Sequence, residues 1–462
     1  MAHRVVITGA GWVTPLGHDI ETVWARLLQG ESGVASTTVF DASTFPTRFA
    51  AEVKGFDLKD FLADDADRHA HASRNARFAL GAAQRAWEDS GLTNWMALAP
   101  SEVGVYLGGG EGPVDFFNFA EAVLAGWHGA PSDEKGTEAR RHEGTKGNPQ
   151  SPIRNPQSPI PHRLDGASWG TVAMRKLSRV RELEQDPNLA AGHIAVQFNA
   201  AGPNFNTLTA CAASTQAIGE AALIIKRGDV NVMISGGTHS MIHPLGVTGF
   251  NRLTALSTRN DTPRQASRPF DRSRDGFVLG EGAGVVILES LEHAKARGAH
   301  ILGEIVGYGS TADAFRVTDI HDQGRGPVAA MRNALDAAGM FPETIDYISA
   351  HGTGTSENDN IETLSIKQVF GDRAKDIPVS SIKSMIGHLI AAAGVVELIV
   401  CLLAIRDGMV PPTINYEHPD PACDLDYVPG KARKHPVRTA LSNSFGFGGQ
   451  NDTLIVTAYH DD

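Results

Sequence analysis

The chain has 462 residues, of which 42% are hydrophobic and 20% charged, a balance that excludes a largely disordered protein. Its formal net charge of −12 argues against a nucleic-acid-binding protein, because neutralising phosphates requires a basic surface. The three cysteines, Cys211, Cys401 and Cys423, are too few and too irregularly spaced for a disulfide framework. We therefore expect a cytoplasmic protein in a reducing environment, with no membrane span.

Short apolar runs alternate with helical patterns along almost the whole chain, beginning with the strand-like "RVVITG" at 4–9. Further strands are expected at 103–108, 230–236, 284–289, 301–309, 346–352, 439–444 and 453–458. Helices are expected at 74–90, 212–227, 327–339, 360–370 and 388–406. This alternation predicts a layered α/β fold with largely buried sheets.

One polar segment, 129–165, interrupts the alternation and contains two consecutive heptads, "NPQSPIR" and "NPQSPIP". Proline at this density blocks both helices and central strands, so we expect an extended surface insertion. A tolerated loop duplication is favoured over a docking role, since surface loops accept insertions readily. The end of "HAKARG" divides the chain into an expected N-terminal half, 1–298, and an expected C-terminal half, 299–462.

Cys211 lies where a strand-like run ends and an Ala-rich helical pattern begins. Two interpretations of this residue alone remain open. It is either a small structural residue packed among alanines or a nucleophile at a helix N-terminus. In the second interpretation, free backbone N–H groups and the helix dipole lower the thiol pKa and can hold an oxyanion.

Three glycine-rich turns favour the nucleophile. "SAHGTGTSENDNIET" (349–363) carries His351, and "VSSIKSMIGHLIAAAGVVE" (379–397) carries Lys383 and His388. "ALSNSFGFGGQND" (440–452) carries two phenylalanines. Both histidines stand at Gly-flanked corners near expected strand ends, where functional sites on layered α/β folds collect.

With these motifs, and with "LSTRND" (256–261), "SRPFDRSRDGFVLGEGAG" (267–284) and "VPPTIN" (410–415), the chain resembles the β-ketoacyl-acyl-carrier-protein synthases. It looks most like the type II elongating synthases (KAS II type), over essentially everything except 129–165. The resemblance implies the thiolase-like fold, in which two similar halves form a five-layer α-β-α-β-α sandwich. It also implies a homodimer that works with acyl carrier protein. Its substrates would be carried on phosphopantetheine, with no separate cofactor and no metal.

The implied reaction is a decarboxylative Claisen condensation that elongates an acyl chain by two carbons in fatty-acid synthesis. Cys211 matches the family nucleophile, His351 and His388 match its two catalytic histidines, and Lys383 matches its active-site lysine. The backbone N–H groups of Cys211 and Phe447 would hold the oxyanion, and Phe447 matches the gating residue of a mobile loop.

The remaining matches concern the surroundings of these residues. By the resemblance, Glu397 pairs with Lys383, whereas Asp359 and Glu362 fill acidic positions after the "HGTGT" turn. For all three carboxylates a plain structural ion-pair network is equally open. The expected substrate-binding residues are Thr353 and Thr355 for the pantetheine arm, Phe250 and Phe445 for the pocket or gate, and Glu111.

Three positions depart from the family pattern. Ser356 replaces a common proline, and Gln450 replaces a common threonine. Glu111 falls where an apolar or small residue usually lines the acyl tunnel, and a carboxylate among methylenes is costly unless paired or protonated. Either Glu111 turns away or the acyl pocket is shortened or polar.

An acidic carrier protein needs a local basic patch, for which Arg68 and Arg74 are the candidates, with Arg252 and Arg259 as further members. A solvated helix face is the alternative for this segment.

The presence of Cys211, His351 and His388 argues against a non-catalytic ketosynthase partner. A thiolase would need a second catalytic cysteine, and neither Cys401 nor Cys423 lies in a Gly-rich turn near the C-terminus. A synthase of a specialised polyketide or unusual lipid stays open as the alternative function.

Overall fold

The computed structural model describes residues 3–95, 97–110, 115–128, 165–316 and 320–461. The insertion at 129–164 and Glu111 lie outside the described residues, so the predictions made for them stay predictions. The chain forms two compact units, one of Met1–Pro113 with Glu184–Asp462 and a smaller one of Val114–Leu183.

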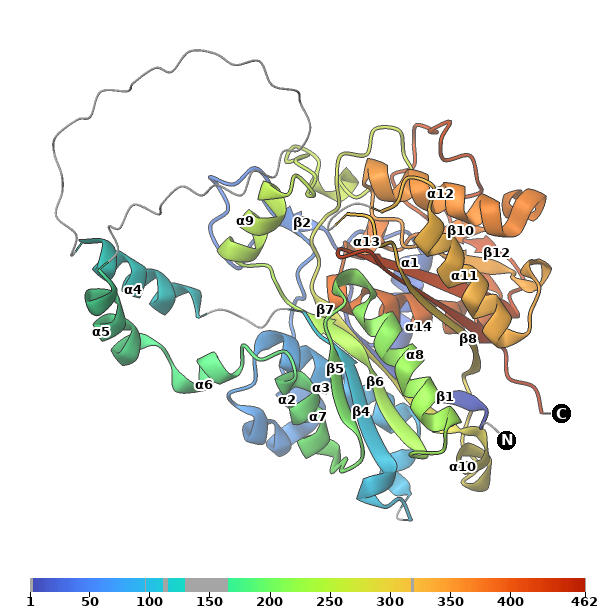
Figure 1. Ribbon diagram of the computed structural model, residues 1–462, viewed down its shortest axis with the longest axis horizontal. Helices are drawn as coiled ribbons and strands as arrows, with labels where there is room; N and C mark the ends of the chain where they lie inside the picture. The colour runs from blue at the N-terminus through green and yellow to red at the C-terminus, as the bar shows by residue number, and fades with distance from the viewer. Residues whose placement is uncertain (1–2, 96, 111–114, 129–164, 317–319, 462) are drawn as a thin grey trace. The chain divides into compact units, whose positions relative to one another are not determined.

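The larger unit is built on a sheet of ten strands among the described residues, in the order β10-β9-β13-β14-β8-β1-β7-β6-β4-β5 (Figure 1). Its N-terminal strands are β1 (Val5–Val13), β4 (Val103–Gly108), β5 (Asn204–Thr207), β6 (Val232–His239) and β7 (Gly282–Ser290). Its C-terminal strands are β8 (Gly303–Ala312), β9 (Tyr347–Ser349), β10 (Val379–Ser380), β13 (Thr439–Gly446) and β14 (Gln450–Thr457).

The two sets of five strands repeat one topology. Numbered along the chain within its own set, each has the order 3-2-4-5-1. In each set the second strand pairs in parallel with the third and the fourth, and the fifth pairs antiparallel with the fourth and the first. The sets meet through a short antiparallel contact of β1 with β8 at Val6 and Ile7.

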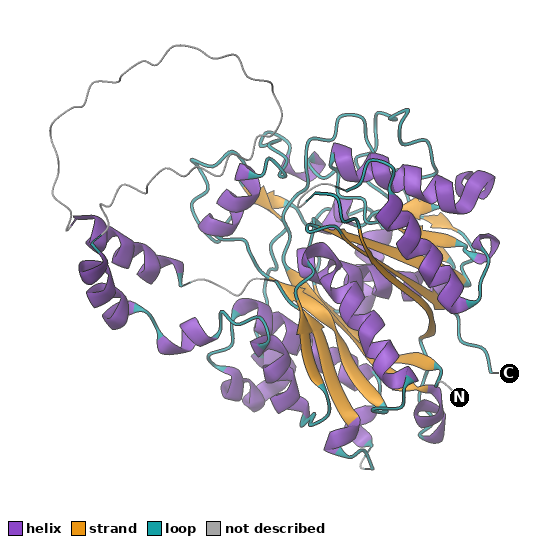
Figure 2. Cartoon of the chain, in the orientation of Figure 1, coloured by secondary structure: helices purple, strands orange, loops and turns teal. Residues whose placement is uncertain are grey.

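Helices cover and separate the two sets of strands (Figure 2). Helix α3 packs on β1 and β7, and α11 packs on β8 and β14, so these two form outer layers. Between the sets lie α8, which contacts β4 and β6, and α14, which contacts β13 and β7. The helices of this unit are α1 (Ile20–Leu28), α2 (Lys59–Leu62), α3 (Arg74–Asp89), α7 (Leu189–Phe198), α8 (Ala213–Lys226), α9 (Pro244–Arg252), α10 (Leu291–Ala296), α11 (Arg325–Ala338), α12 (Ser356–Phe370), α13 (Lys383–Ile386) and α14 (Ala393–Asp407).

Burial explains why these segments take these places. All nine residues of β1 are buried, as expected for a strand covered on both faces. Helix α14 is buried on all sides from Ala393 to Ala404, which is typical of a helix at the centre of a large core. This arrangement is the layered α/β architecture that the sequence predicts. The boundary between the halves at 298 stays a prediction.

The two central helices begin in the same way. A 3-10 turn at Ala210–Ala212 precedes α8, and another at Ile390–Ala392 precedes α14. The first residue of each turn is left-handed, with φ of 47° at Ala210 and 46° at Ile390. A non-glycine residue in this conformation costs roughly 1–2 kcal/mol, so the same strained corner is stabilised twice by the surrounding structure.

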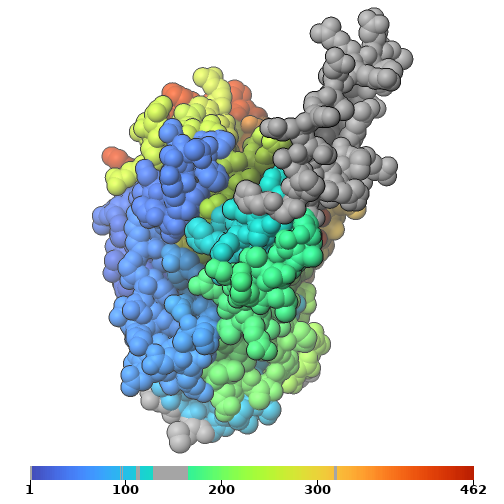
Figure 3. All heavy atoms as spheres, turned by 90° about the vertical axis from the view of Figure 1, so that its left-hand side faces the viewer, coloured from blue at the N-terminus to red at the C-terminus, as the bar shows by residue number. Residues whose placement is uncertain are grey.

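The N-terminal part of the chain, blue in Figure 3, forms a continuous outer surface of the larger unit. The remaining strands of this unit form two short antiparallel pairs. These are β2 (Ala35–Ser36) with β3 (Phe49–Ala50) and β11 (Met409–Val410) with β12 (Arg433–Lys434). No helix within the described ranges is long and apolar enough to cross a membrane.

The smaller unit contains α4 (Phe116–His128), α5 (Gly166–Lys176) and α6 (Arg179–Leu183). Asp165 caps α5 by accepting hydrogen bonds from the backbone of Ala167 and Ser168. A salt bridge of 3.0 Å joins Lys176 of α5 to Glu121 of α4. The two helices are therefore linked by charge as well as by packing.

Candidate active site

Cys211 is the second residue of the 3-10 turn before α8, and it is buried. Its position at a left-handed corner directs the backbone from strand to helix within three residues. The residue belongs to a buried apolar cluster that also includes Ile242, Phe277 and Ile390. The structure therefore places the cysteine at the predicted helix start, inside the protein.

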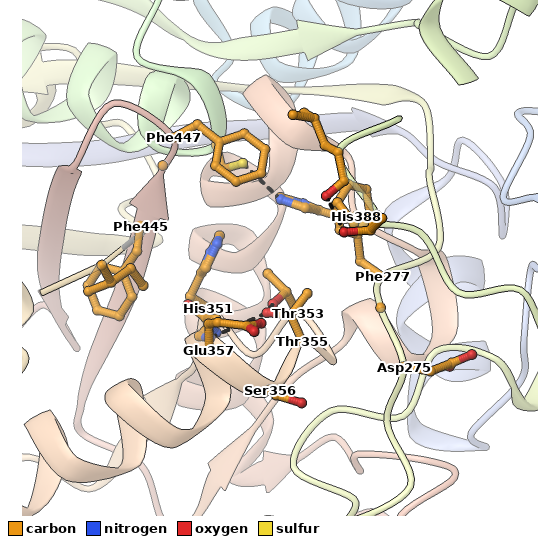
Figure 4. A pocket seen from close by; sticks show the side chains of 18 residues that line it. Asp275, Phe277, His351, Thr353, Thr355, Ser356, Glu357, His388, Phe445 and Phe447 are labelled. Carbon is orange, nitrogen blue, oxygen red and sulfur yellow. Dashed lines mark hydrogen bonds between the residues drawn. The ribbon is translucent and has the colours of Figure 1, made fainter. Parts of the chain in front are cut away.

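His388 is the nearest titratable neighbour of Cys211. Its Nε2 lies 3.0 Å from Sγ, the contact that the dashed line beside the yellow sulfur marks in Figure 4. Its Nδ1 accepts a hydrogen bond of 3.2 Å from the backbone N–H of Ile390. Because Nδ1 accepts, the neutral ring carries its proton on Nε2. His388 therefore presents an N–H donor toward the sulfur.

His351 completes the group from the end of β9, its ring centroid 5.3 Å from that of His388. The Lys383 ammonium donates to the His351 carbonyl oxygen at 2.6 Å and lies 3.4 Å from its Nδ1. This contact assigns the proton of the neutral His351 ring to Nε2 as well. Burial, reinforced by the Lys383 charge, holds the pKa of both imidazoles well below the usual value. Both rings are therefore neutral donors at physiological pH.

One cysteine and two histidines this close also satisfy the composition of a metal site. Ligand atoms of Cys211, His351 and His388 lie within 4.8 Å of one another. A histidine nitrogen binds a metal ion only when it carries no proton, but the contacts at Nδ1 leave a proton on Nε2 of each ring. The two Nε2 atoms are therefore better suited to donate hydrogen bonds than to bind a metal ion.

The thiol pKa differs from the sequence-based expectation. Burial raises the pKa of Cys211 to about 12, against the opposing effects of the Lys383 charge and of the backbone N–H groups of Phe447 and Cys211. The helix-start environment acts in the predicted direction, but desolvation of a thiolate outweighs it. The free protein therefore holds a thiol at neutral pH, not a thiolate.

The glycine-rich loop after β13 reaches the backbone beside Cys211. A Cβ on Gly446 would lie 2.7 Å from the Thr209 carbonyl oxygen and 3.2 Å from the Cys211 nitrogen, so the approach requires glycine. The Phe447 ring lies beside the sulfur in Figure 4 and is 36% exposed. The backbone N–H groups of Cys211 and Phe447 lie close enough to the sulfur to lower its pKa. Both donors are therefore near the place where the oxygen of an attacked carbonyl would carry its negative charge.

Buried carboxylates support the turns that hold these groups. Glu397 on α14 accepts from Lys383 and forms its buried ion pair. Glu362 accepts from the backbone N–H groups of His351 and Gly352 at 2.8 and 2.7 Å. Asp359 accepts from the backbone N–H groups of Phe270 and Gly354 at 2.7 and 3.2 Å. Glu362 and Asp359 therefore shape the His351 turn through its backbone, and burial raises the pKa of both.

Cys211, His351 and His388 line a cavity of 410 Å³. Thr353 and Thr355 line it, and their hydroxyl oxygens are 2.9 Å apart. Phe445 lines it too, with its ring 5.7 Å from that of His351. Phe250 instead packs edge-on against Phe277, at a centroid distance of 5.5 Å. Two threonines and one of the two pocket phenylalanines thus share the cavity with Cys211.

Two residues of the site, Asn358 and His239, were not predicted from the sequence. Asn358 lines the cavity, and its carbonyl oxygen has no hydrogen-bond partner in the described part of the chain. His239, at the end of β6, is buried with both ring nitrogens unpartnered among the described residues, and burial lowers its pKa to about 3. No local pattern marks either residue, because their importance arises from contacts far apart in sequence.

The four arginines of the expected carrier-protein patch differ in how far their charge is already paired with a carboxylate. Arg74 forms a salt bridge of 2.5 Å with the buried Glu281, which neutralises its charge. Arg68 is exposed and lies 3.8 Å from Asp65. Arg259 pairs with Asp275 at 3.3 Å, whereas Arg252 is exposed at the end of α9. Arg68 and Arg252 therefore retain the charge most accessible to a partner.

Family models match the chain in two parts. The model for the N-terminal domain of β-ketoacyl synthases matches residues 2–145 and 167–294. The model for the C-terminal domain of the same synthases matches residues 302–417. Together they cover well over half of the chain, including Cys211, His351 and His388.

Relatives and solved structures agree with these matches. The 3-oxoacyl-[acyl-carrier-protein] synthase 2 of Coxiella burnetii is 43% identical over 458 residues and 99% of both chains. That of Synechocystis is 42% identical over 456 residues, 99% of this chain and 98% of the relative. A β-ketoacyl synthase from Burkholderia phymatum superposes with a TM-score of 0.83 at 31% identity, over 99% of this chain and 100% of the other. A type II PKS ketosynthase, AntDE, in complex with its acyl-carrier protein AntF and bound to the hexaketide, gives 0.80 at 32% identity over 100% of both.

Proposed function

The chain belongs to the β-ketoacyl synthase family, and on this premise we propose that it elongates acyl chains by two carbons through an acyl-enzyme on Cys211. It is a condensing acyltransferase of the thiolase fold. The observation that carries the proposal is one sulfur and two imidazole N–H donors within 4.8 Å, at the end of a cavity lined by two threonines.

The first half-reaction transfers the acyl group to the enzyme. The Cys211 sulfur attacks the carbonyl carbon of an acyl thioester, and the N–H groups of Cys211 and Phe447 hold the oxyanion. The carbon–sulfur bond to the pantetheine arm then breaks. The proton lost by the Cys211 thiol ends on the pantetheine thiolate that leaves, so no side chain retains it.

The second half-reaction uses the two histidines. A malonyl thioester loses CO2, and the electron pair moves to the thioester oxygen as an enolate. The Nε2–H groups of His351 and His388 donate to that oxygen, and neutral rings do so without a permanent charge in the pocket. The enolate carbon attacks the acyl carbonyl on Cys211, and the carbon–sulfur bond to Cys211 breaks. The sulfur leaves as a thiolate and takes up one proton from solvent, which restores the resting thiol.

Lys383 supports the donors without exchanging protons with the substrate. Its ammonium reaches the His351 carbonyl oxygen, the Nδ1 side of the His351 ring and the Glu397 carboxylate. These contacts orient His351 and keep its proton on Nε2. Lys383 is therefore proposed as a positioning residue, with Glu397 as the counter-charge that makes its burial tolerable.

We propose acyl carrier protein as the partner that delivers both thioesters, since the relatives carry it in their names and AntDE binds one. Arg68 and Arg252 are the proposed contacts, and the cytoplasm is the proposed location. A homodimer is supported by β5, which ends the described sheet with a 50% exposed Phe205 and an unpaired backbone edge.

A synthase of a specialised polyketide is the second candidate function. It is favoured by the full-length similarity to AntDE and to an ishigamide ketosynthase/chain length factor, both with TM-scores of 0.80. The non-catalytic partner is disfavoured because the nucleophile and both donors are present and assembled.

The test is a condensation assay with malonyl-carrier protein and a panel of acyl-carrier proteins, using the wild type and Cys211→Gln. We expect the variant to lose chain transfer and to keep decarboxylating malonyl thioester, because the histidine donors remain. A variant that still condenses would refute the acyl-enzyme. A wild type that accepts only polyketide-type acyl groups would favour the second function.

A further inference from the structure

Phe270 combines complete burial with a strained backbone. Its φ of 66° lies in the left-handed region, and its side chain is shielded from solvent. A bulky residue rarely takes this conformation and keeps it only where the surrounding structure holds it there. Strained residues of this kind collect at functional sites. The contacts that hold Phe270 lead to the turn that carries His351.

The backbone of Phe270 is bound to the helix that follows this turn. Its N–H donates to Asp359 Oδ2 at 2.7 Å, and Oδ1 of the same carboxylate accepts from the N–H of Gly354 at 3.2 Å. Asp359 is completely buried, so water does not compete for either hydrogen bond. One carboxylate on α12 therefore holds both the strained residue and the turn.

The ring of Phe270 is fixed by a second aromatic ring. It stacks on Tyr427 at a centroid distance of 3.9 Å and an interplanar angle of 11°. The Tyr427 hydroxyl lies 2.7 Å from the hydroxyl of Thr363, which is also on α12. The ring and the backbone of Phe270 are therefore both fastened to the helix that carries Asp359.

The edge of the Phe270 ring meets the His351 turn at Gly352. A Cβ on Gly352 would lie 3.0 Å from Phe270 Cε2 and 2.7 Å from Ser381 Cβ, so both side chains pack closely against this glycine. Ser381 Oγ also donates to the Gly352 carbonyl oxygen at 2.7 Å. Polar partners thus hold the polar groups of the turn, and the Phe270 ring supplies an apolar contact. A shift of the ring would let the turn move together with the imidazole on it.

We propose that Phe270 positions His351 for decarboxylation by bracing the Gly352 side of its turn. This inference rests on the proposed function, in which the His351 Nε2–H donates to the enolate oxygen. A donor stabilises that oxygen only at hydrogen-bond distance and angle, so a small displacement of the turn weakens the effect. Acylation instead uses the N–H groups of Cys211 and Phe447, which lie outside this turn. Phe270 is therefore a positioning residue for the second half-reaction and leaves the first unaffected.

The test measures the two half-reactions separately in Phe270→Leu, which stays apolar but lacks the ring. Acylation of Cys211 is followed by mass spectrometry as a single-turnover transfer from an acyl-carrier protein. Decarboxylation of malonyl-carrier protein is followed as CO2 release in the Cys211→Gln background, with and without Phe270→Leu. We expect decarboxylation to slow about tenfold or more, as displacement of a catalytic group does, and acylation to change less than about twofold.

Phe370→Leu is the matched control. Phe370 belongs to the same buried cluster as Phe270 but lies at the opposite end of α12 from Asp359. Both rates should stay close to those of the wild type, and a selective loss of decarboxylation in this control would overturn the proposal. So would Phe270→Leu rates that are both unchanged, both reduced by the same factor, or reduced more for acylation than for decarboxylation.

If Phe270→Leu does not fold, Tyr427→Leu takes its place, because it removes the ring on which Phe270 stacks. Its decarboxylation should slow by a larger factor than its acylation, and equal factors would overturn the inference. Failure of the proposed function is a different result, in which the wild type does not acylate Cys211 and Cys211→Gln alone releases no CO2.

Discussion

Two effects of the surroundings shift the pKa of the Cys211 thiol in opposite directions. The N–H groups of Phe447 and Cys211 favour the thiolate, but the thiol is buried among apolar side chains and its pKa rises to about 12. A fully formed thiolate–imidazolium pair would need His388 to bind a second proton, and burial lowers the pKa of that ring. The resting pair is therefore neutral, and attack on a thioester begins from a thiol.

This neutrality predicts how the free enzyme reacts with iodoacetamide. Below a raised pKa the thiolate fraction grows with pH, so the rate of Cys211 alkylation should rise about tenfold per unit from pH 6.5 to 9.5. The measurement is the second-order inactivation rate, with alkylation of Cys211 verified by mass spectrometry. A plateau below pH 8 would mean that the thiolate is already formed near neutrality.

The buried pair of Lys383 and Glu397 predicts non-additive effects on stability. Lys383→Met leaves an uncompensated carboxyl group in the core and should lower the free energy of unfolding by about 3–5 kcal/mol. Adding Glu397→Leu should restore most of that loss, because both desolvated charges are then gone. Denaturant titration of the wild type, both single variants and the double variant measures the coupling, and strictly additive losses would contradict it.

At the scale of elements, the sequence predicts α14 from 388 to 406, whereas the helix runs from Ala393 to Asp407. The apolar pattern continues smoothly through Ile390, but that residue is left-handed and forms a separate turn. β-branched residues disfavour this conformation, so periodicity could not reveal the corner. Motif resemblance identified Cys211, His351, His388 and Lys383, since family patterns carry such positions directly.

Properties set by three-dimensional contact were harder to predict. The raised pKa of Cys211 depends on burial, which a helix-start motif does not report. Arg74 resembled a free surface charge, yet its partner Glu281 is 207 residues away in sequence. Asn358 and His239 carry no local signal at all, because an unpaired atom is visible only once its neighbours are placed.

Three elements of the core meet at a cluster of acidic groups. The Tyr308 hydroxyl on β8 lies 3.1 Å from Asp452 Oδ1 on β14 and 3.4 Å from Glu220 Oε1 on α8. One hydroxyl proton can serve only one of two carboxylates at a time. Burial, together with the Glu220 charge, raises the pKa of Asp452 to about 7.

This cluster predicts a dependence of stability on pH. An acid whose pKa is raised on folding binds more protons in the folded state, so stability falls as pH rises from about 4 to about 7 and the loss is complete above that. Between pH 5 and 8 the wild type should lose about 2–3 kcal/mol through Asp452. Asp452→Asn should lack this loss.

Thermal unfolding of both proteins at pH 5, 6.5 and 8 measures the difference. The variant should gain in melting temperature relative to the wild type as the pH rises. A constant difference across this range would show that Asp452 does not change its protonation in the folded protein.

At the scale of the whole molecule, the sheet has an open edge at β5. The strand is paired with β4 on one side only, and Phe205 is half exposed while stacking on Tyr106 at 5.4 Å. Such an edge is a template for pairing with another strand unless it is covered. A second copy of the chain would cover it.

We predict that Phe205→Arg converts the proposed dimer into a monomer, because it places a charge at an apolar contact. Size-exclusion chromatography with light scattering gives the mass directly. Phe341→Arg is the matched control, since Phe341 is 75% exposed and lies away from β5, next to the start of a short 3-10 turn. Equal masses for the wild type and Phe205→Arg would remove the dimer assignment from this edge.

The twin corners before α8 and α14 carry different side chains at their second position, Cys211 in one and Ala391 in the other. Of the three cysteines, Cys211 alone lines the cavity, so in the proposed mechanism a growing acyl group has a single covalent anchor. The acyl group cannot be transferred to a second cysteine before the condensation step. It stays on that anchor until the incoming carbon nucleophile displaces it, and each cycle therefore finishes before another acyl chain can be loaded.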